Sequence, residues 1–393
     1  MKAISQQLRT GRDCCILLSD RMSCSRRMSN PTSHFIAAVL LVIAAAALGQ
    51  NRDMPPGAQH KSLWTLDLRS SALARERNLY KSPISMSFVD SDTLAVAWFV
   101  SQPQRNVYVD APATLKAVYI DASTGRERSK AQWAASSRPL QVEITSSGKL
   151  LVRTGRSVRL FSAELTELHQ RQFATPKPFR LAVSPDGERV FVCPQADNLT
   201  QAQFLNPDTL EVSSTLRLRA NCGYYLVGDS ATAVRTNNRS EVLVNDSGAW
   251  HSVRLPSSGA QVRFISGNVL ASAGVCSQLV WLTASNGRTL LTLNLPKGRC
   301  WGEMSASHGG DYFGVVEERL RGLKSEALDM YPFPSPEQFV VYRISDQRQV
   351  FRVKVEGISP WFPKNVIEKF AISPKGDLVA IMTNGVIRAY ATK

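Results

Sequence analysis

The sequence predicts an all-β fold built from repeated four-stranded antiparallel units, and two observations carry this prediction. The first is a hairpin pattern that occurs twice, at 179–192 and at 370–381. In both copies, alternating apolar residues give the period of a half-buried strand, and Ser-Pro-x-Gly supplies the turn. The second is that weaker strand-turn-strand signals recur along the chain at steps of about forty residues, which is typical of repeat architectures.

The number of units follows from the positions of these turns. The turns are expected near Ser91, Gly148, Gly187, Asp229, Gly267, Gly310 and Gly376. Four of the steps between them are close to forty residues, and the other two are 57 and 66. We explain the two long steps by insertions at 101–113 and 319–337, which are rich in proline and polar residues. The count gives seven units.

The strands within a unit are clearest in the fifth, where Asn286-Gly287 is a strong hairpin signal. Its four strands are expected at 261–266, 268–275, 278–284 and 288–295. The last unit has only three, at 368–373, 377–383 and 386–391. A spare strand at 61–68 precedes the first unit. If it completes the last unit, the sheets close into a ring and no long edge is left exposed.

The two clearest hairpins, Val183–Val192 and Ile372–Ala380, resemble those of WD40-like and YVTN-type bacterial β-propellers. The resemblance covers only these two stretches, and the Gly-His and Trp-Asp signatures of eukaryotic WD40 repeats are missing. It implies a seven-bladed β-propeller of four-stranded antiparallel blades, closed by the N-terminal strand. Residues 61–393 would then form a single domain.

Residues 1–49 have the pattern of a signal peptide with an extended n-region. Arg26 and Arg27 precede an apolar run at 35–48, and Ala47-Leu48-Gly49 fits a signal peptidase site. Translation starting at Met22 or Met28 would leave an ordinary signal. An uncleaved anchor is the alternative, although the run is shorter than the roughly 20 residues that a membrane helix needs. We therefore expect an exported protein, periplasmic or extracellular, with no stable membrane anchor after cleavage.

The charge of the chain favours anionic partners. The formal net charge is +15, and removing residues 1–49 leaves 41 basic and 30 acidic side chains. The expected partner is a protein, a glycan or another anionic ligand, and no nucleic acid is expected for an exported protein. The alternative is a soluble, arginine-rich surface without a specific anionic partner, since no run of five basic residues occurs.

Four cysteines remain after residue 49: Cys193, Cys222, Cys276 and Cys300. An even number in an oxidising compartment predicts two disulfides, and buried thiols are the alternative. Cys193 and Cys276 would each end the second strand of a blade, while Cys222 and Cys300 would lie in the connections that leave the same two blades. Because bridged Cα atoms must approach within about 7 Å, we expect the pairs Cys193–Cys222 and Cys276–Cys300.

Enzymatic motifs are scarce in this sequence. His60, His169, His251 and His308 show no metal-binding spacing and are interpreted as surface or strand residues. The Gly-x-Ser-x-Gly, Gly-x-Gly-x-x-Gly and P-loop motifs do not occur, and we predict no metal and no cofactor. YVTN-type propellers include lactonase-like enzymes, so the resemblance leaves open a hydrolase with a site in the central channel. The channel rim would then carry Gln141, Glu143, Arg180, Arg263, Glu303 and Glu368. Its arginines would repel a divalent metal but suit an anion.

The loops give the better prediction of function. In a propeller, both insertions and the connection at 358–365 emerge on one face. That face would carry aromatic and cationic side chains, a composition typical of binding surfaces. The candidate residues are Arg105, Tyr108, Arg319, Arg321, Tyr331, Phe333, Trp361, Phe362 and Lys364. We therefore favour a binding or interaction module over an enzyme. A structural component of an envelope assembly is a further alternative, and packing of the aromatic residues onto the propeller would leave this face without a binding role.

Overall fold

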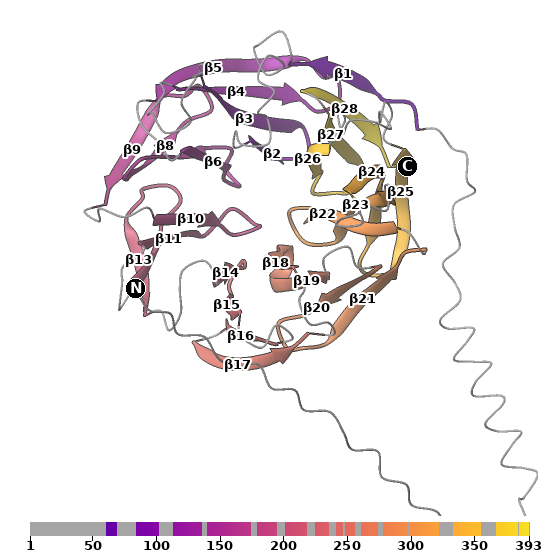
Figure 1. Cartoon of the computed structure of the whole chain (residues 1–393). Helices are drawn as coiled ribbons and strands as arrows, with labels where there is room; N and C mark the ends of the chain where they lie inside the picture. Colours follow the sequence, from indigo (N-terminus) through magenta and orange to yellow (C-terminus); the bar gives the residue numbers. More distant parts are fainter. Residues whose placement is uncertain are drawn as a thin grey trace, which may run out of the picture. The chain divides into compact units, whose positions relative to one another are not determined.

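The computed structural model of the chain describes most of the repeat region. The described residues are 60–68, 84–101, 113–135, 140–173, 179–194, 201–217, 225–235, 241–246, 248–255, 261–273, 278–296, 299–321, 333–354, 367–383 and 385–392. Their strands form seven four-stranded sheets in which every pairing is antiparallel, so the chain is a seven-bladed β-propeller (Figure 1). The fold class predicted from the repeats is confirmed.

The first four blades follow each other along the chain, from the innermost strand to the outermost. Blade 1 contains β2 (Ile84–Phe88), β3 (Thr93–Ser101), β4 (Ala113–Asp121) and β5 (Glu127–Ala135). Blade 2 contains β6 (Leu140–Ile144), β7 (Leu150–Thr154), β8 (Ser157–Phe161) and β9 (Glu167–Gln172). Blade 3 contains β10 (Phe179–Val183), β11 (Val190–Pro194), β12 (Gln201–Leu205) and β13 (Val212–Arg217). Blade 4 contains β14 (Tyr225–Val227), β15 (Thr232–Arg235), β16 (Glu241–Asp246) and β17 (Ala249–Arg254).

The last three blades include the one that is completed by the N-terminal strand. Blade 5 contains β18 (Gln261–Ile265), β19 (Val269–Ala273), β20 (Leu279–Thr283) and β21 (Thr289–Asn294). A single 3₁₀ turn, η4 (Ser266–Asn268), joins its first two strands. Blade 6 contains β22 (Arg299–Ala306), β23 (Tyr312–Arg321), β24 (Phe333–Arg343) and β25 (Arg348–Lys354). Blade 7 contains β26 (Ile367–Ile372), β27 (Leu378–Thr383), β28 (Val386–Ala391) and β1 (Trp64–Asp67).

The core of the propeller is divided among the gaps between blades. Buried apolar residues form seven clusters, and each cluster takes its members from two neighbouring blades. The cluster between blades 7 and 1 completes the circle. Because every strand has one face toward each neighbouring blade, second strands such as β7 and β19 are buried at every position, and their side chains enter the two gaps alternately.

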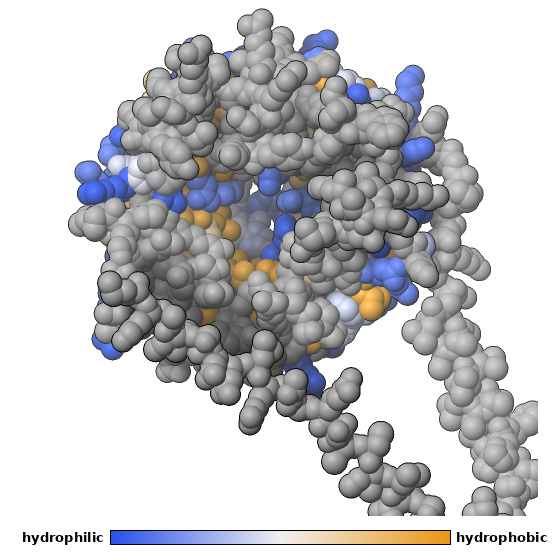
Figure 2. Space-filling view, in the orientation of Figure 1, coloured by the Kyte–Doolittle hydropathy of each residue, from blue (hydrophilic) through white to orange (hydrophobic). Residues whose placement is uncertain are grey.

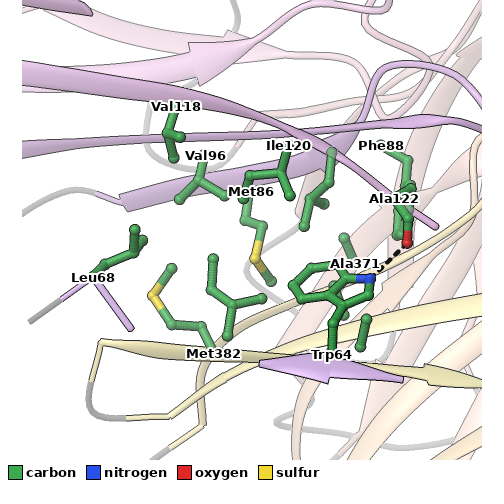
Figure 3. Packing of buried hydrophobic residues seen from close by; sticks show 14 of the residues in the cluster. Trp64, Leu68, Met86, Phe88, Val96, Val118, Ile120, Ala122, Ala371 and Met382 are labelled. Atoms are coloured by element: carbon green, nitrogen blue, oxygen red, sulfur yellow. Dashed lines mark hydrogen bonds between the residues drawn. The ribbon is translucent and has the colours of Figure 1, made fainter. Parts of the chain in front are cut away.

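The closing strand β1 ties blade 7 to blade 1. It pairs with β28 in the register Trp64 opposite Ala389 and Asp67 opposite Val386. The Trp64 indole lies in the cluster between the two blades, and its Nε1 donates a 2.7 Å hydrogen bond to the Ala122 carbonyl of blade 1 (Figure 3). The predicted closure by the N-terminal strand is therefore confirmed, with β1 shorter than the expected 61–68.

The turns between first and second strands share one local mechanism, which explains the repeated Ser-Pro-x-Gly pattern. Ser184 and Ser373 are buried, and their hydroxyls accept hydrogen bonds from the backbone N–H groups of Arg189 (2.9 Å) and Leu378 (3.0 Å). Gly187 and Gly376 follow with φ of +77° and +67°, a region in which glycine is favoured. The turns therefore depend on a buried side-chain acceptor as well as on glycine.

The insertion predicted at 319–337 differs from expectation because part of it is strand. β23 and β24 pair as far as Arg321 opposite Phe333, through a register shift at Glu317/Glu318. The prediction that Arg319, Arg321 and Phe333 lie outside the blade strands is therefore wrong. Pro334 and Pro336 made this stretch resemble a loop in the sequence, because proline is rare inside strands. β24 tolerates both prolines because its pairing with β23 is irregular beside the bulge.

Candidate functional site

A cavity of about 420 Å³ lies where the innermost strands of the seven blades converge. β2, β6, β10, β14, β18, β22 and β26 all contribute residues to its wall. Figure 2 shows the hollow at the middle of the ring of blades, with both hydrophilic and hydrophobic residues on its wall. The volume is within the range of about 300–1,000 Å³ that is usual for small-molecule sites.

The six predicted rim residues lie on the innermost strands. Glu143, Arg263 and Glu303 line the cavity. Gln141 lies beside Glu143 and donates a 2.9 Å hydrogen bond from Nε2 to Glu143 Oε1. For Arg180 and Glu368 the structure describes the backbone in β10 and β26 and not the side chains. The structure thus brings four of the six side chains to the channel.

The charges on the cavity wall are paired. The Arg263 guanidinium lies 3.5 Å from Glu303 Oε1 and donates a 2.8 Å hydrogen bond to the Met304 carbonyl. Lys369 Nζ lies 3.7 Å from the same Glu303 oxygen. With Glu143, the described wall carries two carboxylates and two cations. Arg263 is therefore paired with a carboxylate, while the Arg180 side chain lies outside the described residues, so the anion site expected from the two arginines stays a prediction.

Lys369 is the channel residue that the sequence interpretation missed. The pairing of β26 with β27 shifts register between Ile367 and Lys369, and this bulge changes which residues alternate toward the channel. Counting every second residue from Phe370 along the sequence therefore does not identify Lys369 as a channel residue. Burial raises the pKa of the Glu143 carboxyl. The hydrogen bond from the Gln141 amide and the charge of Lys369 lower this pKa, but to a smaller extent.

The end of the cavity nearest the first-to-second-strand turns contains a histidine. His308 belongs to the turn after β22, is half-buried and lines the cavity, so its interpretation as a surface or strand residue is wrong. Its Nε2 lies 3.0 Å from Ser87 Oγ of β2 in blade 1. The backbone of Asp186 in blade 3 lies near the ring as well, and it acts to raise the pKa of His308. His308 therefore reaches across the channel from blade 6.

The carboxylate of Asp229 holds the turns beside His308 together. Asp229 accepts hydrogen bonds from the backbone N–H groups of Asp186 (3.0 Å) and Gly267 (2.5 Å), which links blades 3, 4 and 5. Burial raises the pKa of Asp229, against these hydrogen bonds. Burial likewise lowers the pKa of His308 from its ordinary value, against the nearby charges of Asp186 and Asp229. At neutral pH the His308 imidazole is therefore mainly uncharged.

Metal binding finds no support in the side chains that the structure describes. Among them, no group of three or more His, Cys, Asp or Glu side chains is arranged to hold a metal ion. Glu303 is flanked by Arg263 and Lys369, and such a carboxylate is a poor ligand for a divalent cation. In the same described residues, no helix is long and apolar enough to span a membrane.

The candidate binding face lies largely outside the described residues. This applies to Arg105, Tyr108, Tyr331, Trp361, Phe362 and Lys364. Arg319, Arg321 and Phe333 are described as backbone in β23 and β24, where Arg321 pairs with Phe333. The structure therefore positions three of the nine candidates and does not show whether the nine come together.

The cysteines differ in part from the prediction. Cys300 is a buried thiol that donates a weak hydrogen bond from Sγ to Glu318 Oε2 over 3.9 Å. The expected Cys276–Cys300 disulfide is therefore wrong for this structure, because Cys300 is in strand β22 and not in the connection before it. Cys193 is fully buried in β11, while Cys222 and Cys276 lie outside the described residues.

Comparison with known proteins gives likeness at the level of structure. No protein-family model matches the chain, and no curated protein matches it. Hsv2 of Kluyveromyces lactis has a TM-score of 0.48 and 10% identity, over 77% of this chain and 90% of that chain. The β-propeller domain of Cps50 (Swd1) of Myceliophteria thermophila also has a TM-score of 0.48, with 13% identity over 78% of this chain and 95% of that chain.

Proposed function

We propose that this propeller is an interaction module that binds an anionic partner, a protein or a glycan, on the face where insertions 101–113 and 319–337 emerge. One observation carries the proposal: in blade 6, β23 and β24 pair further toward this face than the described residues of β22 and β25 do. β22 pairs with β23 as far as Arg299 opposite Arg319, and the described part of β25 pairs with β24 as far as Lys354 opposite Gln338. β23 and β24 continue to Arg321 opposite Phe333.

The paired residues 318–321 of β23 and 333–336 of β24 are named the arm. Since second strands run away from the turn that follows the first strand, the arm extends from the face opposite those turns. Blade 1 has a long ladder in the same direction, in which β3 and β4 pair as far as Ser101 opposite Ala113. β26 of blade 7 contacts both β2 and β22, so blades 1 and 6 flank blade 7. The two extended ladders therefore belong to blades on either side of one blade.

The charge of the chain supports an anionic partner for this face. Without residues 1–49 the chain has 41 basic and 30 acidic side chains, a net charge of +11, and the arm contains Arg319 and Arg321, two residues apart in β23. Guanidinium groups bind carboxylates, sulfates and phosphates through paired hydrogen bonds. A strand-paired arm holds such residues with less conformational entropy to lose on binding than a flexible loop does. The proposed surface therefore combines charge with a fixed backbone.

The arm is tested by binding of two polyanions, polyglutamate and a sulfated glycan, to the purified full-length protein. The variant is Arg319→Ser with Arg321→Ser, and the matched control is Arg126→Ser with Arg288→Ser. The control residues are exposed and lie beside third-to-fourth-strand turns on the opposite face. We expect the arm variant to lose at least about tenfold in affinity, or about 1.4 kcal/mol, and the control to lose much less.

The two probes separate the kinds of partner. Stronger dependence of the polyglutamate affinity on the arm indicates an acidic protein, and stronger dependence of the sulfated glycan affinity indicates a glycan. Equal losses in the arm variant and in the control would show that binding follows net charge alone. That result would overturn the proposal, because the arm would then have no special role.

We further propose that the protein is exported and that it contains one disulfide. The signal-like pattern at 1–49 supports export to the periplasm or the extracellular space. The position of Cys193 near the end of β11 supports its pairing with Cys222, since Cys222 is expected in the connection that leaves the same blade. Non-reducing peptide mapping of the protein recovered outside the cytoplasm is expected to join Cys193 to Cys222 and to leave Cys300 as a thiol. A peptide joining Cys193 to Cys276 would contradict this pairing.

A further inference from the structure

Ser87 and His308 form a hydrogen-bonded pair inside the central cavity. Ser87 Oγ lies 3.0 Å from His308 Nε2, and both residues line the cavity. The Ser87 hydroxyl also lies 3.3 Å from the Phe88 carbonyl, which is an alternative acceptor for its proton. The two residues are 221 positions apart in the sequence, and only the closure of the ring brings β2 near the turn after β22.

His308 also lies beside a third group. The backbone of Asp186 in blade 3 lies close enough to the imidazole to raise its pKa, while Ser87 contacts it from blade 1. Asp186 is itself held by Asp229, which accepts a hydrogen bond from the Asp186 N–H over 3.0 Å. A nucleophile within about 2.6–3.2 Å of a base, with the base oriented by a further group, is the arrangement used in covalent catalysis.

We propose that Ser87 and His308 are a nucleophile and general base that hydrolyse small carboxylic esters within the channel. The Ser87 oxygen attacks the ester carbonyl carbon, and its proton passes to His308 Nε2. The bond from the carbonyl carbon to the alcohol oxygen then breaks, and His308 returns the proton to the departing alcohol. Water attacks the acyl-serine through the same base. The products are the carboxylic acid and Ser87 in its original form.

The cavity suits this reaction in size and polarity. Its volume of about 420 Å³ accommodates a small ester. Arg263 and Lys369 on the same wall are both paired with Glu303, so an uncharged ester suits this wall better than an anion does.

The proposal predicts covalent labelling of one serine. The full-length protein is incubated with a fluorophosphonate, and the modified residue is identified by peptide mass spectrometry, in parallel with hydrolysis of p-nitrophenyl acetate. Ser87→Ala and His308→Gln are each expected to reduce both rates by at least about 100-fold. Ser129→Ala is the control, because Ser129 lies in β5 of the same blade and is not among the residues that line the cavity. Its labelling and hydrolysis rates are expected to stay within about threefold of the parent.

The pH profile of labelling supplies a second readout that does not depend on a substitution. The charged groups near His308 are Asp186, Asp229 and Glu188, and burial outweighs their effect and lowers the pKa of His308. Since only neutral imidazole accepts the serine proton, the labelling rate is expected to rise with pH and to reach half its maximum below pH 6.5.

Two results would overturn the proposal. One is labelling of the parent protein that is absent or that falls on a serine other than Ser87. The other is equal labelling of the parent and of the Ser87→Ala variant. If His308→Gln unfolds the protein, the parent's labelled residue and its pH profile still decide the outcome. Neither readout involves the arm, so failure here leaves the proposed interaction surface unaffected.

Discussion

At the scale of single residues, the chain places two neighbouring carboxylates in opposite environments. Glu317 is buried, with its oxygens 3.2 Å from the Arg299 guanidinium and 3.3 Å from that of Arg352. Glu318 faces the other side of β23, where burial raises the pKa of its carboxyl and the hydrogen bond from Cys300 lowers it to a smaller extent. The negative charge of Glu303 adds to the increase. The carboxylate of Glu317 is therefore balanced by two guanidinium groups, whereas that of Glu318 is not balanced.

Replacing each glutamate with glutamine is expected to change stability in opposite directions. A carboxyl with a raised pKa stays protonated in the folded state above the pH at which the unfolded chain releases its proton. Stability is therefore lost as pH rises from about 4.5 through the raised pKa of Glu318. Glu318→Gln removes this loss and is expected to stabilise the protein at pH 8, with little effect at pH 4.

Glu317→Gln is the contrasting variant. It leaves two guanidiniums beside an uncharged amide and is expected to destabilise the protein by about 2 kcal/mol or more, at the low end for a buried pair because both arginines are partly exposed. Urea unfolding at pH 4 and pH 8 measures both effects. A loss of stability in Glu318→Gln at pH 8 would show that its carboxylate is well compensated.

At the scale of elements, the turns between first and second strands fix each blade against its neighbour. A Cβ built on Gly187 would lie 2.3 Å from the Ser146 backbone nitrogen of blade 2. Gly287, in the third-to-fourth-strand turn of blade 5, has a φ of +88° and nothing within 4 Å. Both positions need positive φ, but only Gly187 also needs the absence of a side chain.

Alanine substitutions at these two glycines separate backbone strain from packing. Gly287→Ala is expected to cost about 1 kcal/mol, because an L-residue at positive φ is strained. Gly187→Ala is expected to cost a further 1–3 kcal/mol or so, since the turn must move away from blade 2. Denaturant unfolding of both variants measures the difference. Equal losses of stability would show that the turn of blade 3 can move away from blade 2 at little cost.

At the scale of the whole molecule, closure of the ring rests on β1. Trp64 of β1 is only 9% exposed and joins the cluster between blades 7 and 1, whereas the adjacent Leu63 is 52% exposed. The closing strand also covers Val386 and Ile387 of β28. Without it, blade 7 would present an unpaired apolar edge, which is a site of aggregation.

Trp64→Ala is therefore expected to destabilise the whole propeller and not one blade. The loss is expected to be about 3–5 kcal/mol, from the cavity left by the indole and the lost hydrogen bond to Ala122. Leu63→Ala is the control, with an expected change within about 0.5 kcal/mol. The two variants are compared by thermal and urea unfolding. Unchanged stability in Trp64→Ala would mean that the ring holds together without this contact.

The sequence by itself determined the repeated unit, the number of blades and the closing strand. These features are local: alternating apolar residues set each strand, and the Ser-Pro-x-Gly turns of blades 3 and 7 set the hairpins. Where local patterns were irregular, the interpretation failed. The prolines at 334 and 336 obscured the start of β24, and a bulge in β26 obscured the position of Lys369 on the channel wall.

Only the tertiary structure decided which residues meet at the centre of the ring. The pairing of Ser87 with His308, and of Arg263 and Lys369 with Glu303, joins different blades. Such contacts depend on the angle and height of each blade relative to the others, which are set by packing in the seven gaps. No spacing in the sequence encodes that geometry, because each blade contributes only one short strand to the channel.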